Sequence, residues 1–389
     1  MSIALHWFLP TYGDSRFIVG GGHGLPAGSA HSDRDASIDY LASIVRGAES
    51  FGFTGALIPT GAWCEDAFVT AAFLARETTS LAFLVAFRPG LVSPTLSAQM
   101  AATFARHAPG RILLNVVVGG EAHEQRSFGD HLSKDDRYAR CDEFLEVVRG
   151  LFAGETVTLQ GNHVNVEEAA LALPPNPIPP LYFGGSSGAA GPVAARHADV
   201  YLTWGEPPDA VRKKVDWIRG LAEQEGRDVR FGIRLHTISR DTADEAWAQA
   251  DKFISALDEE TVANAQKGLH RSESEGQRRM LALHEEHRAN GTWNDARSLE
   301  IAPNLWAGVG LVRGGAGTAL VGSHADVADR IAEYVEVGID EFIFSGYPHL
   351  EELYWFGEGV VPILRERGLF KGEANSAAPA SIPFVGARR

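Results

Sequence analysis

Cysteine and long apolar runs are both scarce in this chain of 389 residues. Its two cysteines, Cys64 and Cys141, are too few for a disulfide framework and are typical of a reducing compartment. No apolar run reaches the ~18 residues that a membrane-spanning helix needs. The opening MSIALHWFLP lacks the basic region of a signal peptide. We therefore expect a soluble, cytoplasmic protein.

Positively charged residues are also fewer than negatively charged ones. Lysine and arginine number 35 against 50 aspartates and glutamates, which gives a formal net charge of −15. A field of that sign repels nucleic acid and anionic membranes, so we expect neither as a partner. An anionic ligand would need a local cluster of positive side chains. The apolar share of 45% is ordinary for a globular protein and excludes a disordered chain.

Short apolar runs alternate with amphipathic helical patterns along most of the chain. Several of the runs, such as LAFLVAFRP, are apolar throughout, which is typical of parallel strands buried on both faces. The strands are predicted at residues 3–10, 54–60, 81–89, 111–120, 179–187, 199–206, 229–239 and 340–348. Eight strand–helix units predict a (β/α)8 TIM barrel with insertions over residues 1–370. A doubly wound open sheet is the alternative, but no G-x-G-x-x-G motif follows the first strand.

Three segments interrupt this alternation. Residues 156–168 alternate around a Gly-Asn pair and predict an inserted hairpin. Residues 258–322 are charge-rich at first and glycine-dense at the end, which favours either a mobile lid or an oligomer contact. In the lid interpretation, the glycines around Arg313 act as a hinge that lets this arginine swing inward. The tail 371–389 is expected to be flexible or to contact another subunit.

Polar and aromatic residues follow nearly every predicted strand. Chemistry in TIM barrels lies at the carboxyl ends of the strands, so these residues are candidates for a site. Arg234 and His236 alternate along one predicted strand, so both side chains should face the barrel interior. A cation there needs a partner, either an anionic substrate or a buried glutamate. The candidates are Tyr12, Cys64, Arg88, Asn115, Trp204, Arg234, His236, Tyr347 and His349.

The segment GGSS at residues 184–187 precedes a predicted helix. Its glycines permit close backbone approach, and its serines offer hydroxyls and free N–H groups to an anion such as a phosphate. Arg137 and Tyr138, at the start of another predicted helix, would favour a mononucleotide phosphate. The alternative is an ordinary helix-capping serine pair. We expect no metal site.

Seven segments together resemble the two-component alkanesulfonate monooxygenases of the bacterial luciferase-like superfamily. They are WFLPTYGD, LIPTGAWCEDAF, PPLYFGGSS, YLTWGEPP, FGIRLH, NLWAGVGLVRGGAGTALVG and FSGYPHLEE. The resemblance implies a (β/α)8 barrel that uses FMNH2, supplied by a separate NAD(P)H-dependent flavin reductase, and O2. It also implies cleavage of the C–S bond of an organosulfonate to sulfite and an aldehyde, and a homo-oligomer (dimer or tetramer).

The resemblance also assigns site residues. The catalytic set falls on Cys64, Trp204, Arg234, His236, Tyr347 and His349, with Arg313 as a mobile-loop arginine. The flavin contacts fall near Trp7, Asn115, Tyr138, Gly185, Ser186 and Ser187. The two arginines would hold the sulfonate, and the two histidines would transfer protons or bind substrate. Cys64 has no adjacent base, so we interpret it as a packing residue rather than a nucleophile.

Two departures from the family pattern border the expected substrate pocket. Tyr12 stands where the family has a histidine, and the chain is longer than usual after Tyr12 and near residues 285–300. Both departures bear on the substrate more than on the reaction. A related flavin or deazaflavin enzyme acting on a sulfone, a sulfosugar or an alkane therefore stays an alternative, as does a non-catalytic flavin-binding subunit.

Overall fold

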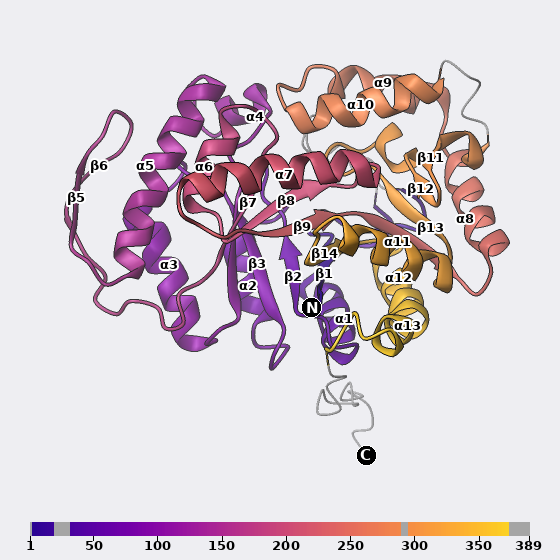
Figure 1. The fold of residues 1–389 in the computed structure, drawn as a ribbon, viewed down its shortest axis with the longest axis horizontal. Coiled ribbons are helices and arrows are strands. Elements are labelled where there is room, and N and C mark those ends of the chain that lie inside the picture. The colour runs from indigo at the N-terminus through magenta and orange to yellow at the C-terminus, as the bar shows by residue number, and fades with distance from the viewer. Residues whose placement is uncertain (1, 19–31, 289–294, 373–389) are drawn as a thin grey trace.

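Eight parallel strands close into a barrel at the centre of the molecule (Figure 1). The structure is a computed structural model that describes residues 2–18, 32–288 and 295–372. Around the barrel, the strands follow the order β1-β14-β9-β8-β7-β4-β3-β2. Their bounds are β1 (Ala4–Phe8), β2 (Gly55–Ile58), β3 (Ala82–Phe87), β4 (Ile112–Val116), β7 (Leu181–Gly184), β8 (Val200–Trp204), β9 (Arg230–Arg234) and β14 (Glu341–Phe344). The predicted TIM barrel is confirmed, and the open-sheet alternative is wrong.

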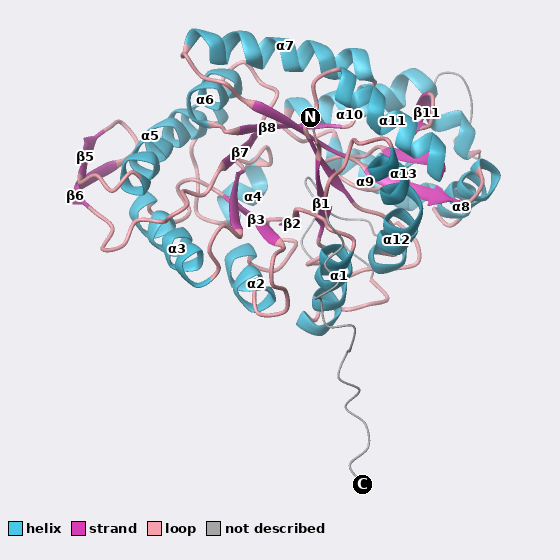
Figure 2. Ribbon diagram, turned by 60° about the horizontal axis from the view of Figure 1, so that its bottom comes forward, coloured by secondary structure: helices cyan, strands magenta, loops and turns pink. Residues whose placement is uncertain are grey.

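Helices surround the barrel on its outer side (Figure 2). Several begin at a serine or aspartate whose side chain accepts a hydrogen bond from a main-chain N–H in the first turn, as Ser37, Asp66 and Ser133 do. Their bounds are α1 (Ile38–Ser50), α2 (Ala67–Leu74), α3 (Pro94–His107), α4 (Ala122–Ser127), α5 (Lys134–Phe152), α6 (Ala190–His197), α7 (Pro208–Gln224), α11 (His324–Glu336), α12 (His349–Trp355) and α13 (Val361–Glu366). None of the helices in the described ranges is long and apolar enough to cross a membrane.

Side chains along each barrel strand alternate between the interior and the helical layer. The interior holds one apolar cluster, which includes Phe8, Leu84, Tyr182 and Ile343. The larger cluster lies between strands and helices, and Trp7 belongs to it. This alternation decides which residues of β1 can reach a site inside the barrel.

The predicted hairpin at residues 156–168 is confirmed. Strand β5 (Val157–Gln160) pairs antiparallel with β6 (Asn165–Ala169), and the pair stands out from the body beside α5 (Figure 1). The Glu143 carboxylate of α5 accepts hydrogen bonds at 2.8–2.9 Å from the main-chain N–H groups of residues 162–164, which fixes the turn.

The predicted strand 229–239 is wrong as one element, because it divides at Leu235. Barrel strand β9 ends at Arg234, and β10 (His236–Arg240) leaves the barrel to pair in parallel with β13 (Ala319–Ser323). The main chain causes the change, since Leu235 N–H still bonds to Ile343 of β14 while His236 N–H bonds to Thr318. Arg234 and His236 therefore lie on different sheets. The second sheet also holds β12 (Leu305–Trp306) and β11 (Glu300–Ala302), in the order β10-β13-β12-β11.

Residues 258–322 do not form one loosely packed lid. Their first half holds the paired helices α9 (Glu259–Leu269) and α10 (Glu275–Arg288), which follow α8 (Ala243–Ser255). The short 3-10 helices η1 (Ala296–Leu299) and η2 (Gly308–Leu311) come next, and every residue from 305 to 322 is buried. This second half therefore buries apolar surface. Residues 19–31, 289–294 and 373–389, which include most of the expanded loop and the tail, lie outside the described residues.

The glycines near Arg313 permit close packing of the main chain. A Cβ added at Gly317 would lie 2.7 Å from Gly310 Cα, and one added at Gly308 would lie 2.0 Å from the Trp306 ring. Gly310 N–H also bonds to Gly317 O at 2.9 Å. These glycines let two stretches of backbone touch within a buried layer, and the hinge stays a prediction.

Candidate active site

A cavity opens at the carboxyl ends of the barrel strands, and we call it the central cavity. It contains about 1420 Å3 of empty space, part of which is open to solvent. Trp204 and Arg234, the last residues of β8 and β9, line it beside Asn115 of β4. Residues 274–277 at the start of α10 and residues 313–316 complete its wall.

Most of the predicted site residues gather at this cavity. Eight of them line it directly: Asn115, Tyr138, Gly185, Ser186, Ser187, Trp204, Arg234 and Arg313. His236, Tyr347 and His349 are buried and do not line it, but their rings contact one another behind the arginines. Tyr347 stacks on His236 with ring centroids 5.7 Å apart and meets His349 edge-on at 5.4 Å.

One end of the central cavity has the features of a phosphate site. A Cβ added at Gly185 would lie 2.8 Å from Ala190 Cβ and 3.1 Å from the Tyr138 hydroxyl, so only glycine permits this close approach. The buried Ser187 hydroxyl lies beside the Tyr138 phenol and makes no hydrogen bond of ordinary geometry with the described residues. These features, just before the N-terminus of α6, fit the phosphate of a mononucleotide such as FMN.

Two buried arginines form the opposite, cationic part of the cavity. Arg234 is 8% exposed and Arg313 is 4% exposed, and both guanidinium groups lie over the Phe8 ring, at 4.5 and 5.5 Å. Within the part of the chain that the structure describes, no carboxylate forms an ion pair with either arginine. The alternative of a buried glutamate partner is therefore wrong for these residues. Burial, followed by the charge of Arg313, lowers the pKa of Arg234 to about 9.

Arg313 is held in place by two phenols. Its Nη1 donates a hydrogen bond to the Tyr347 hydroxyl at 3.1 Å, and its guanidinium lies 4.7 Å from the centre of the Tyr12 ring. Burial raises the pKa of Tyr12 well above its usual value, although the Arg313 charge opposes this shift. Tyr12, the residue that departs from the family pattern, is thus a neutral phenol packed against the Arg313 guanidinium.

Both histidines are neutral and bonded to main-chain carbonyls. His236 Nε2 lies 3.1 Å from Ala316 O, and His349 Nδ1 lies 3.1 Å from Phe8 O. Burial lowers the pKa of both histidines, and the charges of Arg234 and Arg313 lower it further. Neither histidine lines the central cavity, which disfavours the expected role in proton transfer to a ligand there.

Trp7 and Cys64 lie away from the central cavity. Trp7 is fully buried among Phe53 and Phe356 in the helical layer, because Phe8 takes the inward direction on β1. The flavin contact predicted for Trp7 therefore finds no place in this geometry. Cys64 lines a separate hollow with Tyr12, and burial raises the pKa of its thiol to about 12. That pKa fits a packing residue and not a nucleophile.

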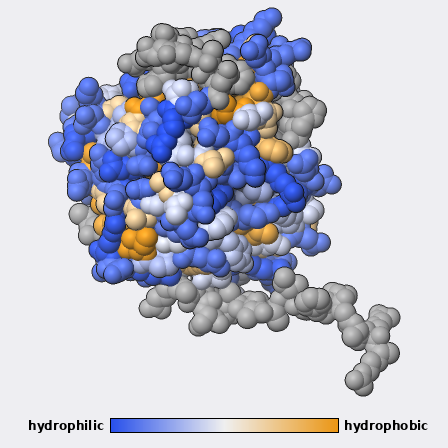
Figure 3. All heavy atoms as spheres, turned by 90° about the vertical axis from the view of Figure 1, so that its right-hand side faces the viewer, coloured by the Kyte–Doolittle hydropathy of each residue, from blue (hydrophilic) through white to orange (hydrophobic). Residues whose placement is uncertain are grey.

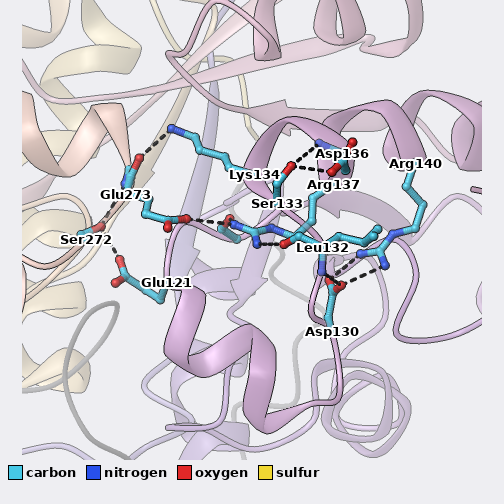
Figure 4. A network of polar contacts seen from close by, with 12 residues as sticks. Glu121, Asp130, Leu132, Ser133, Lys134, Asp136, Arg137, Arg140, Ser272 and Glu273 are labelled. Atoms are coloured by element: carbon cyan, nitrogen blue, oxygen red, sulfur yellow. Dashed lines mark hydrogen bonds and ion pairs between the residues drawn. The ribbon is translucent and has the colours of Figure 1, made fainter.

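A polar network joins the loop between α9 and α10 to the body of the barrel (Figure 4). Lys134 Nζ donates to Glu273 O at 2.6 Å, and the Ser272 hydroxyl donates to the Glu121 carboxylate. Arg137 donates to Leu132 O at 2.8 Å and pairs with Glu273 at 3.4 Å. Arg137 is therefore held by protein groups and does not line the cavity as a phosphate ligand would.

Sequence reasoning missed three residues at or behind this cavity. Lys134 lines the cavity one helical turn before Tyr138, and that spacing alone places both on one face of α5. Ser345 follows β14 directly, but the predicted strand ran to residue 348, so the rule of strand ends passed over Ser345. Neither helical spacing nor a strand end marks Gln277 as a site residue. None of the described residues forms a group of three or more side chains that could hold a metal.

The model of the luciferase-like monooxygenase family matches residues 19–341 of this chain. Solved structures share its fold at low identity. A riboflavin lyase with modified FMN and substrate riboflavin is 21% identical with a TM-score of 0.72, over 97% of this chain and 94% of that chain. A long-chain alkane monooxygenase is 22% identical with a TM-score of 0.72, over 96% and 93%. The EDTA monooxygenase from Chelativorans sp. BNC1 is 17% identical with a TM-score of 0.72, over 96% of each chain.

Proposed function

Because the chain belongs to the luciferase-like monooxygenase family, we propose that it uses FMNH2 and O2 to cleave the C–S bond of an organosulfonate. The products would be sulfite and an aldehyde. The observation that carries this proposal is the pair Arg234 and Arg313, which are buried at the central cavity with no carboxylate partner among the described residues. A sulfonate would supply the missing negative charge.

The chemistry of the head group supports this choice. A guanidinium presents a planar fork of N–H donors that matches the oxygens of a sulfonate, so two arginines can share one head group. An uncharged alkane or sulfone would leave both desolvated cations unpaired, which is costly. The Phe8 ring beneath both guanidiniums adds a cation–π contact and an apolar floor for the substrate chain.

The opposite end of the cavity would hold the cofactor. Ser186, Ser187 and Lys134 would bind the phosphate of reduced FMN, while Tyr138 and Gly185 shape that end. When bound, reduced FMN activates O2 and delivers one oxygen atom to the substrate. Since the sequence carries no dinucleotide motif, a separate NAD(P)H-dependent flavin reductase would supply the FMNH2.

Residues of this chain would bind, orient and shield the reactants. Arg234 and Arg313 would fix the sulfonate and then stabilise the charge of the departing sulfite. Trp204 and the start of α10 would exclude water, since a Cβ added at Gly276 would lie 2.9 Å from the Trp204 ring. A homo-oligomer and a cytoplasmic location complete the proposal.

Sulfite release from a panel of substrates tests this function. The purified chain, with FMNH2 supplied by a flavin reductase, is incubated with alkanesulfonates, a sulfosugar, a sulfone and an alkane. We expect sulfite from at least one sulfonate, and its loss in the Arg234→Met variant. Oxidation of the sulfone or alkane without sulfite release from any sulfonate would contradict the proposal and favour an uncharged substrate.

A further inference from the structure

Three hydrogen bonds behind the central cavity connect Arg234 to the segment that carries Arg313. Arg234 Nη2 donates to Ser345 Oγ at 2.7 Å, and Ser345 Oγ lies 2.7 Å from His236 Nδ1. His236 Nε2 in turn lies 3.1 Å from Ala316 O, three residues after Arg313. Each of these side chains is at most 8% exposed, so water does not compete for the bonds.

The donor and acceptor chemistry of these groups determines which atom carries the hydrogen in each of the three hydrogen bonds. A carbonyl oxygen can only accept, so His236 carries its hydrogen on Nε2 and donates it to Ala316 O. A guanidinium can only donate, so Ser345 accepts from Arg234 and its own hydrogen points to His236 Nδ1. A hydrogen on Nδ1 would make that atom a donor to Ser345 Oγ and leave the Ser345 hydroxyl hydrogen without this acceptor, so the arrangement satisfies each group only while His236 is neutral.

His236 also contacts the support of the second arginine. Its ring stacks on Tyr347 at an interplanar angle of 14°, and the Tyr347 hydroxyl accepts from Arg313 Nη1 at 3.1 Å. One imidazole therefore supports both guanidiniums, Arg234 through Ser345 and Arg313 through Tyr347 and Ala316. It does so although β9 and β10 belong to different sheets.

We propose that Ser345 and His236 are positioning residues that hold Arg234 and Arg313 at the separation and orientation a single sulfonate head group requires. This inference rests on the proposed function, since it assumes that the two arginines bind one anion. Neither residue touches the ligand. His236 acts as a fixed neutral tautomer and not as an acid or base.

Paired serine variants test this role with a matched control. Ser239 is also fully buried and also bonds to a histidine, at 2.6 Å from His324 Nδ1, but among the described residues no hydrogen bond joins Ser239 or His324 to Arg234 or Arg313. The dissociation constants of 1-octanesulfonate and of FMN are measured by calorimetry for the wild type, Ser345→Ala and Ser239→Ala. We expect sulfonate affinity to fall about tenfold or more in Ser345→Ala, since the hydrogen bond lost there is to a charged group. FMN affinity should stay within about twofold, and Ser239→Ala should leave both affinities unchanged.

Nitrogen NMR of histidine-labelled protein gives an independent readout on the wild type, with His236→Gln to assign the signal. We expect His236 to be the neutral Nε2–H tautomer from pH 6 to 8. A charged or Nδ1–H ring would overturn the proposal, as would equal sulfonate affinity in Ser345→Ala and the wild type.

Failure of the proposed function and failure of the positioning role give different results. If the wild type binds no sulfonate, or if Arg234→Met binds it as tightly, the proposed function fails. If Arg234→Met loses binding while Ser345→Ala keeps it, only the positioning role fails. Should Ser345→Ala not fold, Ser345→Cys keeps the size of the side chain with a weaker acceptor, and an unchanged sulfonate affinity there would also overturn the role.

Discussion

Two arginine side chains define what this cavity can accept. Arg234 and Arg313 lie over the same Phe8 ring, and no other described group neutralises their charge. Removing such a cation from a desolvated ion pair costs about 2–5 kcal/mol, because the partner charge is left unpaired. We therefore expect sulfonate binding to depend on these two residues more than on any of the aromatic groups around them.

Substituting Arg234 by methionine tests that dependence while keeping much of the side-chain volume. We expect kcat/KM for sulfonate to fall by about 30-fold or more, with a melting temperature close to that of the wild type. Arg227→Met is the control, because Arg227 pairs with Asp199 at 3.2 Å and does not line the cavity. Sulfite assays that gave equal activity for the two variants would contradict an anion-binding Arg234.

The pH dependence of binding follows from the shifted pKa values. His236 and His349 have lowered pKa values and stay neutral, so sulfonate affinity should be constant from about pH 6 to 8 and show no histidine step near 6.5. Arg234, with a pKa of about 9, is charged below that pH and loses its proton above it. Affinity should therefore fall as the pH rises through about 9. Calorimetric titrations at several pH values check this, and a transition near pH 6.5 would instead assign a histidine to binding.

At the residue scale, the sequence predicted much of the cavity and part of the layer that supports it. The strand-end rule correctly placed Asn115, Trp204 and Arg234, because the carboxyl ends of parallel strands meet at one edge. It failed for Trp7, since the inward or outward direction on β1 depends on strand register. It also overlooked Ser345, whose partners come from distant parts of the chain. Contacts between such distant residues are set by tertiary packing and leave no local pattern.

At the element scale, residues 258–322 combine a surface helical pair with a buried sheet. Figure 1 shows α9 and α10 side by side above β11–β13, while residues 305–322 pack beneath them as part of a second core. On the surface of this side of the molecule, apolar residues form small, scattered patches (Figure 3). Composition averaged over the whole segment concealed this difference, because charged helices and apolar strands follow each other closely.

Limited proteolysis should separate these two halves. We expect cleavage within residues 258–288 of the ligand-free protein and slower cleavage once FMNH2 and sulfonate are bound anaerobically. Residues 305–322 should resist in both states, because their backbone is buried. Mass spectrometry of the fragments locates the sites. Cleavage at 305–322 in the native protein, or no effect of ligands on 258–288, would contradict this division.

The start of α5 links the phosphate end of the cavity to the α9–α10 loop. Lys134 lines the cavity and holds Glu273 O at 2.6 Å, so a bound phosphate and the loop would share one ammonium group. In Lys134→Met we expect FMN affinity to fall about tenfold, as for a lost charge-assisted hydrogen bond, and riboflavin affinity to stay unchanged. The control is Lys213→Met, at an exposed position of α7. Fluorescence titrations measure both flavins, and equal losses for FMN and riboflavin would exclude a phosphate contact.

At the scale of the whole molecule, the alternation of strands and helices was enough to predict the barrel. Continuous apolar runs such as β3 carry that signal, because a parallel strand is buried on both faces. The contacts at the amino-terminal ends of the barrel strands are harder to predict. There Glu341 accepts hydrogen bonds from Tyr182 at 2.8 Å and bonds to His6 at 3.0 Å, joining three strands. These partners of the buried Glu341 carboxylate come together only when the barrel closes.

The proposed anion site also depends on the whole molecule, because its residues come from three separate parts of the chain. Arg234 comes from a barrel strand, Arg313 from the inserted segment, and Tyr12 from the loop after β1. The fold alone does not select a substrate, since similar barrels include a riboflavin lyase and a long-chain alkane monooxygenase. The charge of the cavity makes that selection in our account.

One calorimetric comparison tests this central claim most directly. The wild-type protein is titrated with 1-octanesulfonate and with 1-octanol, which share a chain and differ in head-group charge. An anion-binding arginine pair predicts that the sulfonate binds about 30-fold more tightly or better, and that the difference disappears in the double variant Arg234→Met, Arg313→Met. Equal affinities of the wild type for the two ligands would contradict the account and assign this cavity to an uncharged substrate.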